Sequence, residues 1–214
     1  MKTAIIGVGN LGGTVARHLV AADELVVLAA ADEAHAKALA DELGANASAA
    51  SVEDAIEGAD AVVLATWLDQ TRELVPAQTR LLENKIVVDP SNPIGFDESG
   101  QMIRTLPEGE SSGSVVAGLL PASAHYVKAF GSLGADQLAT GANHDPRIVL
   151  FYATDDDAAE ATAQRLIRAT GFEPLKVGGV SDAGRIEGPD GELQGRALDL
   201  DEARATIAIE GVKT

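Results

Sequence analysis

The sequence predicts an α/β protein of the Rossmann-like, doubly wound type, with a mainly parallel sheet of about eight strands and helices on both faces. Two observations predict this fold. Short, continuous apolar runs alternate with amphipathic segments of helical length, which is typical of strands buried on both faces of a parallel sheet. The first apolar run also leads directly into a glycine-rich turn and a helix, as in a βαβ nucleotide-binding unit.

The apolar runs and the amphipathic segments define the expected elements in chain order. Strands rich in Val, Ile, Leu and Ala are expected at residues 4–8, 25–30, 61–66, 86–89, 125–130, 147–153 and 173–177. Helices are expected at residues 11–21, 33–43, 52–57, 70–82, 114–120, 157–170 and 201–209. The irregular stretch at residues 93–113 is either a lid or wall of a substrate pocket or a plain surface excursion.

Size and composition favour one domain over residues 1–214. The chain is 46% hydrophobic, which is enough for a sizeable core. Residues 178–214 are expected to form a C-terminal extension with a role in the site or in a dimer.

Charge and composition narrow the classes of partner. The net charge of −17 opposes binding to nucleic acid and to anionic membranes. The chain has no cysteine, so a disulfide scaffold and a Cys-ligated metal are excluded. No membrane-length apolar run and no leader-like segment is recognisable, and a cytoplasmic protein is expected.

The turn after the first strand has the spacing of the dinucleotide fingerprint G-x-G-x-x-G. Gly7 permits the tight turn, Gly9 lets the backbone approach a pyrophosphate, and Gly12 lets the helix pack close to the strand. The helix that begins near Leu11 then directs its first amide groups at the phosphates.

The end of the second strand is the position that distinguishes NAD from NADP. An acid there binds the ribose 2′-hydroxyl, whereas an arginine accommodates a 2′-phosphate. This chain has Ala30 and Ala31, followed by Asp32, twenty positions after Gly12. Asp32 is either the ribose acid or only the N-cap of the next helix.

Polar and aromatic residues follow several of the other expected strands. Ligands in parallel α/β sheets bind outside the carboxyl ends of the strands, so we expect these residues to meet the glycine loop there. Trp67 either lines a pocket for a planar ring or plugs the core under the next helix. The residues after the strands are Thr66, Trp67, Ser91, Asn92, Phe130 and Ser132.

Other chemistries find little support. The four histidines show no metal-ligand spacing, and no G-x-S-x-G elbow occurs. The acids at 155–157 precede an expected helix, where capping explains them better than a metal site. No metal is expected. Lys128 and Arg185 are the basic residues of interest, although a surface salt bridge would also explain Arg185.

Five segments, taken together, resemble a known family over about residues 3–188. They are IIGVGNLGGTVARHL, ADAVVLATW, NKIVVDPSNP, YVKAFGSLGADQL and LIRATGFEPLKVGGVSDAGRIE. The sequence resembles the NADPH-dependent coenzyme F420 reductases, and is similar to the cytosolic reductase domain of the six-transmembrane metalloreductases. The resemblance implies one Rossmann-like domain, a homodimer, and hydride transfer between a nicotinamide and a deazaflavin or flavin.

The resemblance also assigns site residues by position. Gly9, Asn10 and Leu11 correspond to the pyrophosphate loop. Thr66 and Trp67 would lie beside the nicotinamide ribose, and Ser91 and Asn92 in the turn after the next strand. The segment with Phe130, Ser132 and Leu133 would line the nicotinamide pocket, and Trp67, Ser132 and Leu133 would form the hydride pocket.

Two features leave alternatives open. Relatives carry Ser-Arg where this chain has alanines at 29–31, so NADP follows from the resemblance while NAD remains an alternative.

Hydride transfer needs alignment of two rings more than an acid or a base, so the lack of a catalytic pair does not separate an enzyme from a nucleotide-sensing module. A dehydrogenase of a small substrate, with its site completed by a dimer, is a third hypothesis.

Overall fold

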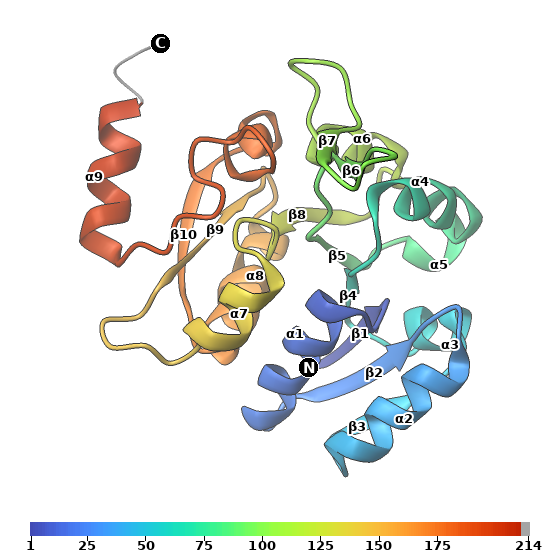
Figure 1. Cartoon of the computed structure of the whole chain (residues 1–214). Coiled ribbons are helices and arrows are strands. Elements are labelled where there is room, and N and C mark those ends of the chain that lie inside the picture. Colours follow the sequence, from blue (N-terminus) through green and yellow to red (C-terminus); the bar gives the residue numbers. More distant parts are fainter. Residues whose placement is uncertain (211–214) are drawn as a thin grey trace.

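The computed structural model, which describes residues 1–210, contains an eight-stranded sheet in the order β10-β9-β8-β5-β4-β1-β2-β3. All neighbouring strands are parallel except β8 and β9, which are antiparallel. This is the Rossmann-like, doubly wound sheet that the sequence predicts (Figure 1). The strands are β1 (Lys2–Ile6), β2 (Leu25–Ala29), β3 (Ala47–Ala49), β4 (Ala61–Leu64), β5 (Ile86–Asp89), β8 (His125–Ala129), β9 (Val149–Ala153) and β10 (Glu173–Gly178).

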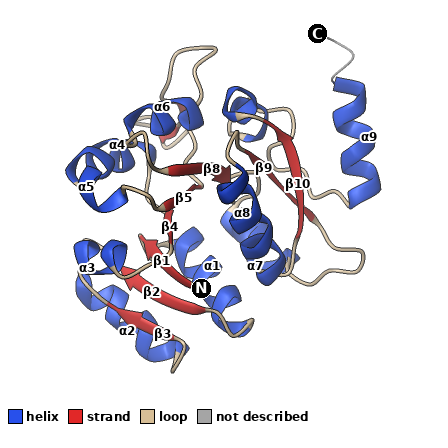
Figure 2. Cartoon of the chain, turned by 180° about the vertical axis from the view of Figure 1, so that it is seen from behind, coloured by secondary structure: helices blue, strands red, loops and turns tan. Residues whose placement is uncertain are grey.

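Helices cover both faces of the sheet (Figures 1 and 2). One face packs against α1 (Asn10–Ala21), α2 (Glu33–Leu43), α7 (Ala135–Gly141) and α8 (Asp157–Ala169). The other face packs against α3 (Val52–Glu57), α4 (Leu68–Ala77), α5 (Thr79–Leu82) and α6 (Ser112–Leu119). The 3₁₀ segment η1 (Val180–Ile186) and α9 (Leu200–Glu210) close a third apolar cluster on β9 and β10.

Alternating side chains along each strand explain the two large clusters. In β1, Ile5 points into the cluster under α1, while Ala4 and Ile6 point into the cluster under α3 and α4. Because both faces are buried, the strand reads as a continuous apolar run.

Several expected bounds need correction. The first strand ends at Ile6 instead of residue 8, because Gly7 has a φ of +97°. The single helix expected at 70–82 is two helices, α4 with Pro76 inside it and α5 from Thr79, with Gln78 between them at a φ of −111°. Helix α6 begins at Ser112, two residues earlier than expected, because the Ser111 hydroxyl caps it by accepting from the Ser114 amide at 3.0 Å.

Several elements were absent from the expectation, among them the 3₁₀ segment η1. Strand β3 is a short, partly exposed edge strand, and α7 lies in a stretch to which no element was assigned. The irregular stretch at residues 93–113 contains an antiparallel hairpin of β6 (Ile94–Phe96) and β7 (Met102–Arg104). The last residues of the predicted extension, 211–214, lie outside the described residues.

Candidate functional site

The glycine loop is packed so tightly against the end of β4 that two of its glycines cannot be replaced by a residue with a side chain. A Cβ atom on Gly7 would lie 2.4 Å from the carbonyl oxygen of Ala65. A Cβ atom on Gly12 would lie 2.0 Å from the carbonyl oxygen of Gly7. Heavy atoms cannot approach that closely without a shift of the backbone, so Gly7 and Gly12 fix the turn and the start of α1 on the sheet.

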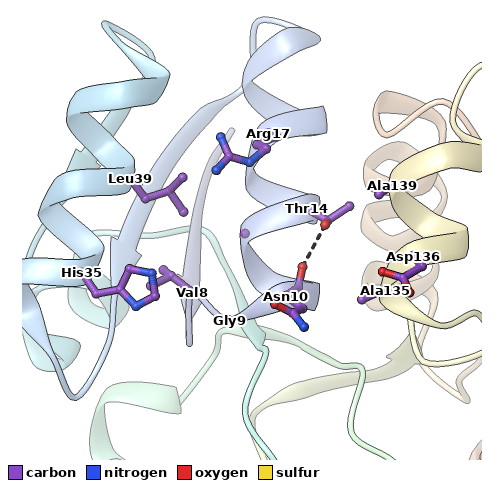
Figure 3. A pocket seen from close by; sticks show the side chains of 11 residues that line it. Val8, Gly9, Asn10, Thr14, Arg17, His35, Leu39, Ala135, Asp136 and Ala139 are labelled. Atoms are coloured by element: carbon purple, nitrogen blue, oxygen red, sulfur yellow. Dashed lines mark hydrogen bonds between the residues drawn. The ribbon is translucent and has the colours of Figure 1, made fainter.

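Gly9 is in the opposite situation, because a Cβ atom there would meet nothing within 4 Å. Gly9 is the N-cap of α1, and no side chain among residues 1–208 caps the helix in its place. The first amides of α1 therefore face an open surface beside Gly9 and Asn10 (Figure 3). Open space and helix amides together are what a phosphate group requires.

The parallel strands bring the predicted residues to one edge of the sheet in two groups. In the first group, the glycine loop contacts the segment after β4: a Cβ atom on Gly7 would lie 3.1 Å from Cγ2 of Thr66. In the second group, Asn92 Nδ2 donates to the carbonyl of Gly131 at 2.9 Å, and Asn92 Oδ1 accepts from the amide of Gly188 at 3.0 Å. The C-terminal extension thus reaches the turn after β5.

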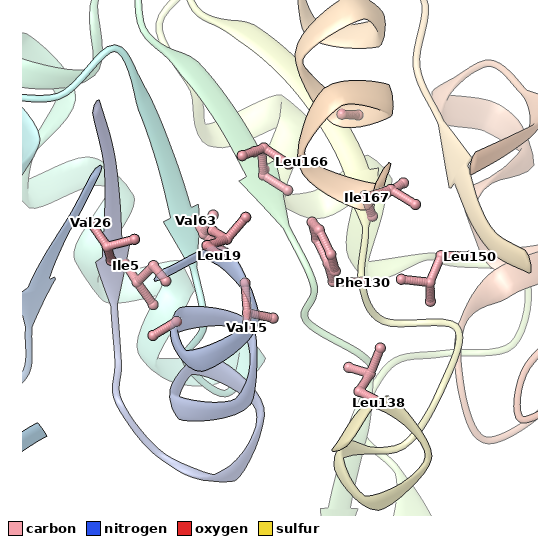
Figure 4. Close-up of a cluster of buried hydrophobic side chains, with 14 of the residues drawn as sticks. Ile5, Val15, Leu19, Val26, Val63, Phe130, Leu138, Leu150, Leu166 and Ile167 are labelled. Atoms are coloured by element: carbon pink, nitrogen blue, oxygen red, sulfur yellow. The ribbon is translucent and has the colours of Figure 1, made fainter. Parts of the chain in front are cut away.

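The segment after β8 has buried side chains. Phe130 has a φ of +67°, and its ring packs in the core beside Leu166 and Ile167 (Figure 4). Leu133 belongs to the same cluster and Ser132 is fully buried. These side chains do not open onto the surface, so a contact with a bound ring at this segment would involve its backbone.

Two buried hydroxyl groups near this edge lack a partner. The Oγ atoms of Ser91 and Ser132 have no hydrogen bond within the described part of the chain. A buried polar atom without a partner is uncommon in folded proteins. Both residues were singled out from the sequence as site residues, and in this structure both hydroxyls are buried.

Trp67 is not a core plug, because 57% of its surface is exposed. Its ring lies against that of Phe96 from the β6–β7 hairpin, with centroids 6.1 Å apart and planes at 81°. The exposed large apolar residues of the described chain are Leu25, Trp67, Phe96, Met102 and Ile103. Three of the five belong to the hairpin, and Trp67 touches it. Sequence reasoning missed Phe96, because its partner Trp67 is distant in sequence.

The end of β2 carries no cation. Ala30 and Ala31 follow the strand, and Asp32 caps α2 by accepting from the amide of Ala34 at 3.0 Å. The capping interpretation of Asp32 is therefore confirmed, and its contact with a ribose stays a prediction.

A buried cluster of charged groups lies where β5 and β8 end. Lys128 is fully buried, and its ammonium group is 3.2 Å from Asp89 Oδ2, 3.4 Å from Glu187 Oε1 and 2.7 Å from the Ser112 hydroxyl. The same ammonium donates to the carbonyl of Ser91. Lys128 was noted from the sequence, whereas its partners were not.

The two carboxylates of this cluster have further donors. Asp89 accepts from the amide of Ser91 and from the Tyr126 hydroxyl, each at 2.8 Å. Glu187 accepts from the first two amides of α6, those of Ser112 and Gly113, each at 2.8 Å. Burial and the nearby Asp89 raise the pKa of Tyr126 well above its ordinary value, so the phenol stays protonated and can donate. The cluster ties the extension to the turn that carries Ser91.

The remaining candidates have structural roles. Arg185 forms an ion pair with Glu192 at 2.6 Å, which agrees with the salt-bridge interpretation. Asp156 caps α8 by accepting from the amide of Ala159. Among residues 1–210 there is no group of three or more potential metal ligands. No helix in that range has both the length and the apolar character needed to cross a bilayer.

Comparisons with known proteins agree with the geometry. Residues 2–93 match the model of the family described as NADP oxidoreductase, coenzyme F420-dependent. The metalloreductase STEAP3 of Rattus norvegicus is 28% identical over 186 residues, which are 87% of this chain. The chain spans 36% of the length of that relative.

Solved structures share the fold over most of the chain. A hypothetical protein, SMa0349 of Sinorhizobium meliloti, superposes with a TM-score of 0.81 at 30% identity, covering 93% of this chain and 95% of that one. A proposed F420-dependent NADP-reductase from Arthrobacter sp. FB24 has a TM-score of 0.74 at 24% identity, covering 86% and 87%. A reductive aminase from Aspergillus terreus in complex with NADPH has a TM-score of 0.62 at 18% identity, covering 99% and 61%.

Proposed function

We propose that the chain, whose residues 2–93 match the model of the coenzyme F420-dependent NADP oxidoreductases, binds NADP(H) and transfers a hydride between this cofactor and a deazaflavin or flavin-type acceptor. One observation carries the proposal: Gly9 leaves open space directly in front of the uncapped first turn of α1. Gly7 and Gly12 hold that space in place by backbone contacts that exclude any other residue.

The chain's own residues suit a dinucleotide along the carboxyl edge of the sheet. The amides of Asn10 and Leu11 would hold the pyrophosphate at the start of α1. Ala30 and Asp32 would border the adenine ribose, as their place after β2 suggests. The nicotinamide end would lie toward Thr66 and toward the turn that carries Ser91 and Asn92.

At this end the nicotinamide would contact the backbone of the segment after β8, because the side chains of Phe130, Ser132 and Leu133 are buried. When bound, reduced nicotinamide supplies the hydride. The residues around it need only orient two rings and exclude water, which does not require an acid–base pair. Trp67 and Phe96 present aromatic surface beside this edge, and we assign them to the wall that an acceptor ring contacts.

The extension contributes to the same edge in this proposal. The amide of Gly195 donates to the carbonyl of Ser132 at 2.7 Å, and Glu187 belongs to the Lys128 cluster. Residues 178–210 would therefore shape the nicotinamide end within one chain. A homodimer is also part of the proposal through the family resemblance, and light scattering of the purified protein tests it.

Gly9→Val tests the phosphate site. The added side chain would occupy the open space and block the pyrophosphate, but it meets no protein atom, so the fold should survive. We expect NADP⁺ binding to fall below detection in calorimetry while the unfolding midpoint stays near that of the parent. Gly118→Val is the matched control, because a Cβ atom at Gly118 in α6 also meets nothing within 4 Å. Undiminished NADP⁺ binding by folded Gly9→Val would remove the phosphate role.

Turnover with defined acceptors tests the reaction. NADPH oxidation is followed at its own absorbance band with F420, FMN or FAD as acceptor, each under oxygen-free conditions. We expect turnover with a deazaflavin or a flavin. Tight NADPH binding without turnover on any of them would favour the nucleotide-sensing module over the enzyme.

A further inference from the structure

The backbone of Ser91, in the turn after β5, has a partner for each of its polar groups. Its amide donates to Asp89 Oδ1 at 2.8 Å. Its carbonyl accepts from the Ser112 hydroxyl at 2.9 Å and also from the Lys128 ammonium. These three partners are buried, and they come from three different elements, β5, α6 and β8. The position of Ser91 is therefore set by buried side chains that the neighbouring elements supply.

The side chain of the next residue, Asn92, connects the same turn to two further segments. Its Nδ2 donates to the carbonyl of Gly131, which follows β8, and its Oδ1 accepts from the amide of Gly188 in the C-terminal extension. Each end of the side-chain amide thus joins the turn to a different part of the chain. A shift of either part would move the turn with it.

Glu187 connects the contacts of Ser91 with those of Asn92. Its buried carboxylate accepts from the first two amides of α6 at 2.8 Å each and lies 3.4 Å from the Lys128 ammonium. It therefore holds both donors to the Ser91 carbonyl, because one of them is Lys128 and the other is on the first residue of α6. The residue that follows it, Gly188, is the one that donates to Asn92.

The same part of the extension also contacts the β6–β7 hairpin. A Cβ atom on Gly188 would lie 2.7 Å from Cδ1 of Ile94, the first residue of β6. At the last residue of β7, Arg104 pairs with Asp190 at 3.2 Å. The hairpin carries Phe96, which belongs to the proposed aromatic wall. The segment that begins at Glu187 thus contacts both the turn and the strands that present this wall.

These contacts all lie at one half of the proposed site. None of them involves the glycine loop, which is fixed by its own packing against Ala65 and the start of α1. A change at Glu187 should therefore displace the turn after β5 and leave the glycine loop in place. The two halves of a bound dinucleotide should respond to that change differently.

We propose that Glu187 is a positioning residue: through Lys128 and the first turn of α6 it sets the turn of Ser91 and Asn92, and so places the nicotinamide ring for hydride transfer. The inference rests on the proposed function, because it takes the nicotinamide end to lie at this turn. Glu187 is buried and acts through its neighbours. Alignment matters here because a displacement of about 1 Å can slow a reaction about a hundredfold.

The experiment compares NADPH with 2′-phospho-ADP-ribose, which lacks only the nicotinamide ring. Dissociation constants for both are measured by calorimetry with the full chain and with Glu187→Gln, which keeps the size of the side chain and removes its charge. We expect NADPH to bind about tenfold more weakly, as for the loss of one hydrogen bond, whereas affinity for the fragment stays unchanged. Glu192→Gln is the matched control: it makes the same change in the same extension, at an exposed residue that pairs with Arg185 at 2.6 Å.

Ser112→Ala decides the question if Glu187→Gln does not fold. It removes the hydroxyl that donates to the Ser91 carbonyl and leaves both ion pairs of Lys128 in place. We expect the same selective loss of NADPH affinity, smaller in size, and no loss in Ser114→Ala, which removes an exposed hydroxyl from the same helix.

Three results would overturn the inference while leaving the proposed function intact: equal weakening of both ligands, as from a purely structural residue, unchanged NADPH affinity in the folded variants, or the same selective loss in Glu192→Gln. Failure of the parent protein to bind NADPH would instead overturn the proposed function, and the inference with it. Binding without turnover in the parent would overturn the proposed hydride transfer, while the two affinities would still test Glu187.

Discussion

Two regions at the carboxyl edge of the sheet are stabilised in different ways. The glycine loop after β1 is fixed by close packing of backbone atoms, whereas the segments after β5 and β8 are fixed by buried charged side chains. At the first place, Gly12 lies against the Gly7 carbonyl with no room for a methyl group. At the second, the Lys128 ammonium lies 3.2 Å from Asp89 Oδ2 and 3.4 Å from Glu187 Oε1. The two regions lie at the same edge of the sheet, with β4 between β1 and β5, and belong to the same proposed site.

The difference indicates how each region tolerates change. Backbone packing depends on the absence of side-chain atoms, so the glycine region is sensitive to size and indifferent to charge. The charged cluster is stable only as a set, because burying a charge raises the free energy of the folded state unless its oppositely charged partners are also present. Substitutions can therefore separate the two mechanisms.

Lys128→Met should have the largest effect. It leaves Asp89 and Glu187 buried without their cation, and removal of one partner of a buried ion pair costs about 3–5 kcal/mol. The measurement is the free energy of unfolding in urea.

The control for charge loss alone is Lys37→Met, whose lysine is exposed and should change stability by less than about 0.5 kcal/mol. A variant that also carries Asp89→Asn and Glu187→Gln removes every charge and should recover part of the loss. If Lys128→Met alone changes the free energy of unfolding only slightly, the ion pairs of Lys128 do not stabilise the cluster.

Gly12→Ala should rank second. The new methyl carbon would lie 2.0 Å from the Gly7 carbonyl oxygen, and overpacking of this kind costs about 1–3 kcal/mol. Gly118→Ala adds the same atom where nothing lies within 4 Å, and it should be neutral or stabilising. Equal unfolding midpoints for these two variants would contradict the close packing at Gly12.

Tyr126→Phe should rank third and should depend on pH. The phenol donates to Asp89 at 2.8 Å, and a hydrogen bond to a charged group contributes about 1.5–3 kcal/mol, partly offset here by the other donors to Asp89. The pKa of Tyr126 is raised in the folded state, so its contribution is complete below the unfolded pKa of about 10 and is lost as pH rises further.

Unfolding in urea at pH 8 and above pH 10 measures that dependence. The parent should lose more stability across this interval than Tyr126→Phe does. Tyr152→Phe is the companion variant, since burial raises the pKa of Tyr152 as well but that residue lies outside the cluster. Parallel losses in the parent and in Tyr126→Phe would argue against a protonated phenol in the cluster.

Trp67→Ala should have the smallest effect on stability and a clear effect on function. A side chain that is 57% exposed contributes little to the core, so the free energy of unfolding should change by less than about 0.5 kcal/mol. Turnover with a deazaflavin or flavin should fall, while affinity for ADP-ribose stays constant. A protein that unfolds readily after this substitution would have Trp67 in a packing role.

The sequence predicts well what depends on local pattern. Apolar runs and the spacing of Gly7, Gly9 and Gly12 locate the βαβ unit, because neighbouring residues determine strands, turns and helix starts. Strand β3 has three small, partly exposed residues and offers no apolar run. The pairing of Trp67 with Phe96 and of Asn92 with Gly131 depends on the tertiary fold, so no local pattern predicts it.

The cluster is the strongest example of this limit. Lys128 looks like an ordinary strand lysine in the sequence, and Glu187 lies 75 residues beyond the Ser112 amide that it binds. The sequence also does not reveal that Phe130 has a positive φ and a fully buried side chain.

The reach of Glu187 has a consequence for the order in which the molecule assembles. A chain that grows from its N-terminus can form the β1–α1–β2 unit early, and its glycine loop additionally needs only the end of β4 at Ala65. The turn that carries Ser91 must wait for Glu187, because Lys128 and the first amides of α6 lack that carboxylate until η1 has folded. In the proposed site, the end that would receive the phosphates is therefore expected to be complete during synthesis before the end that would receive the reacting ring.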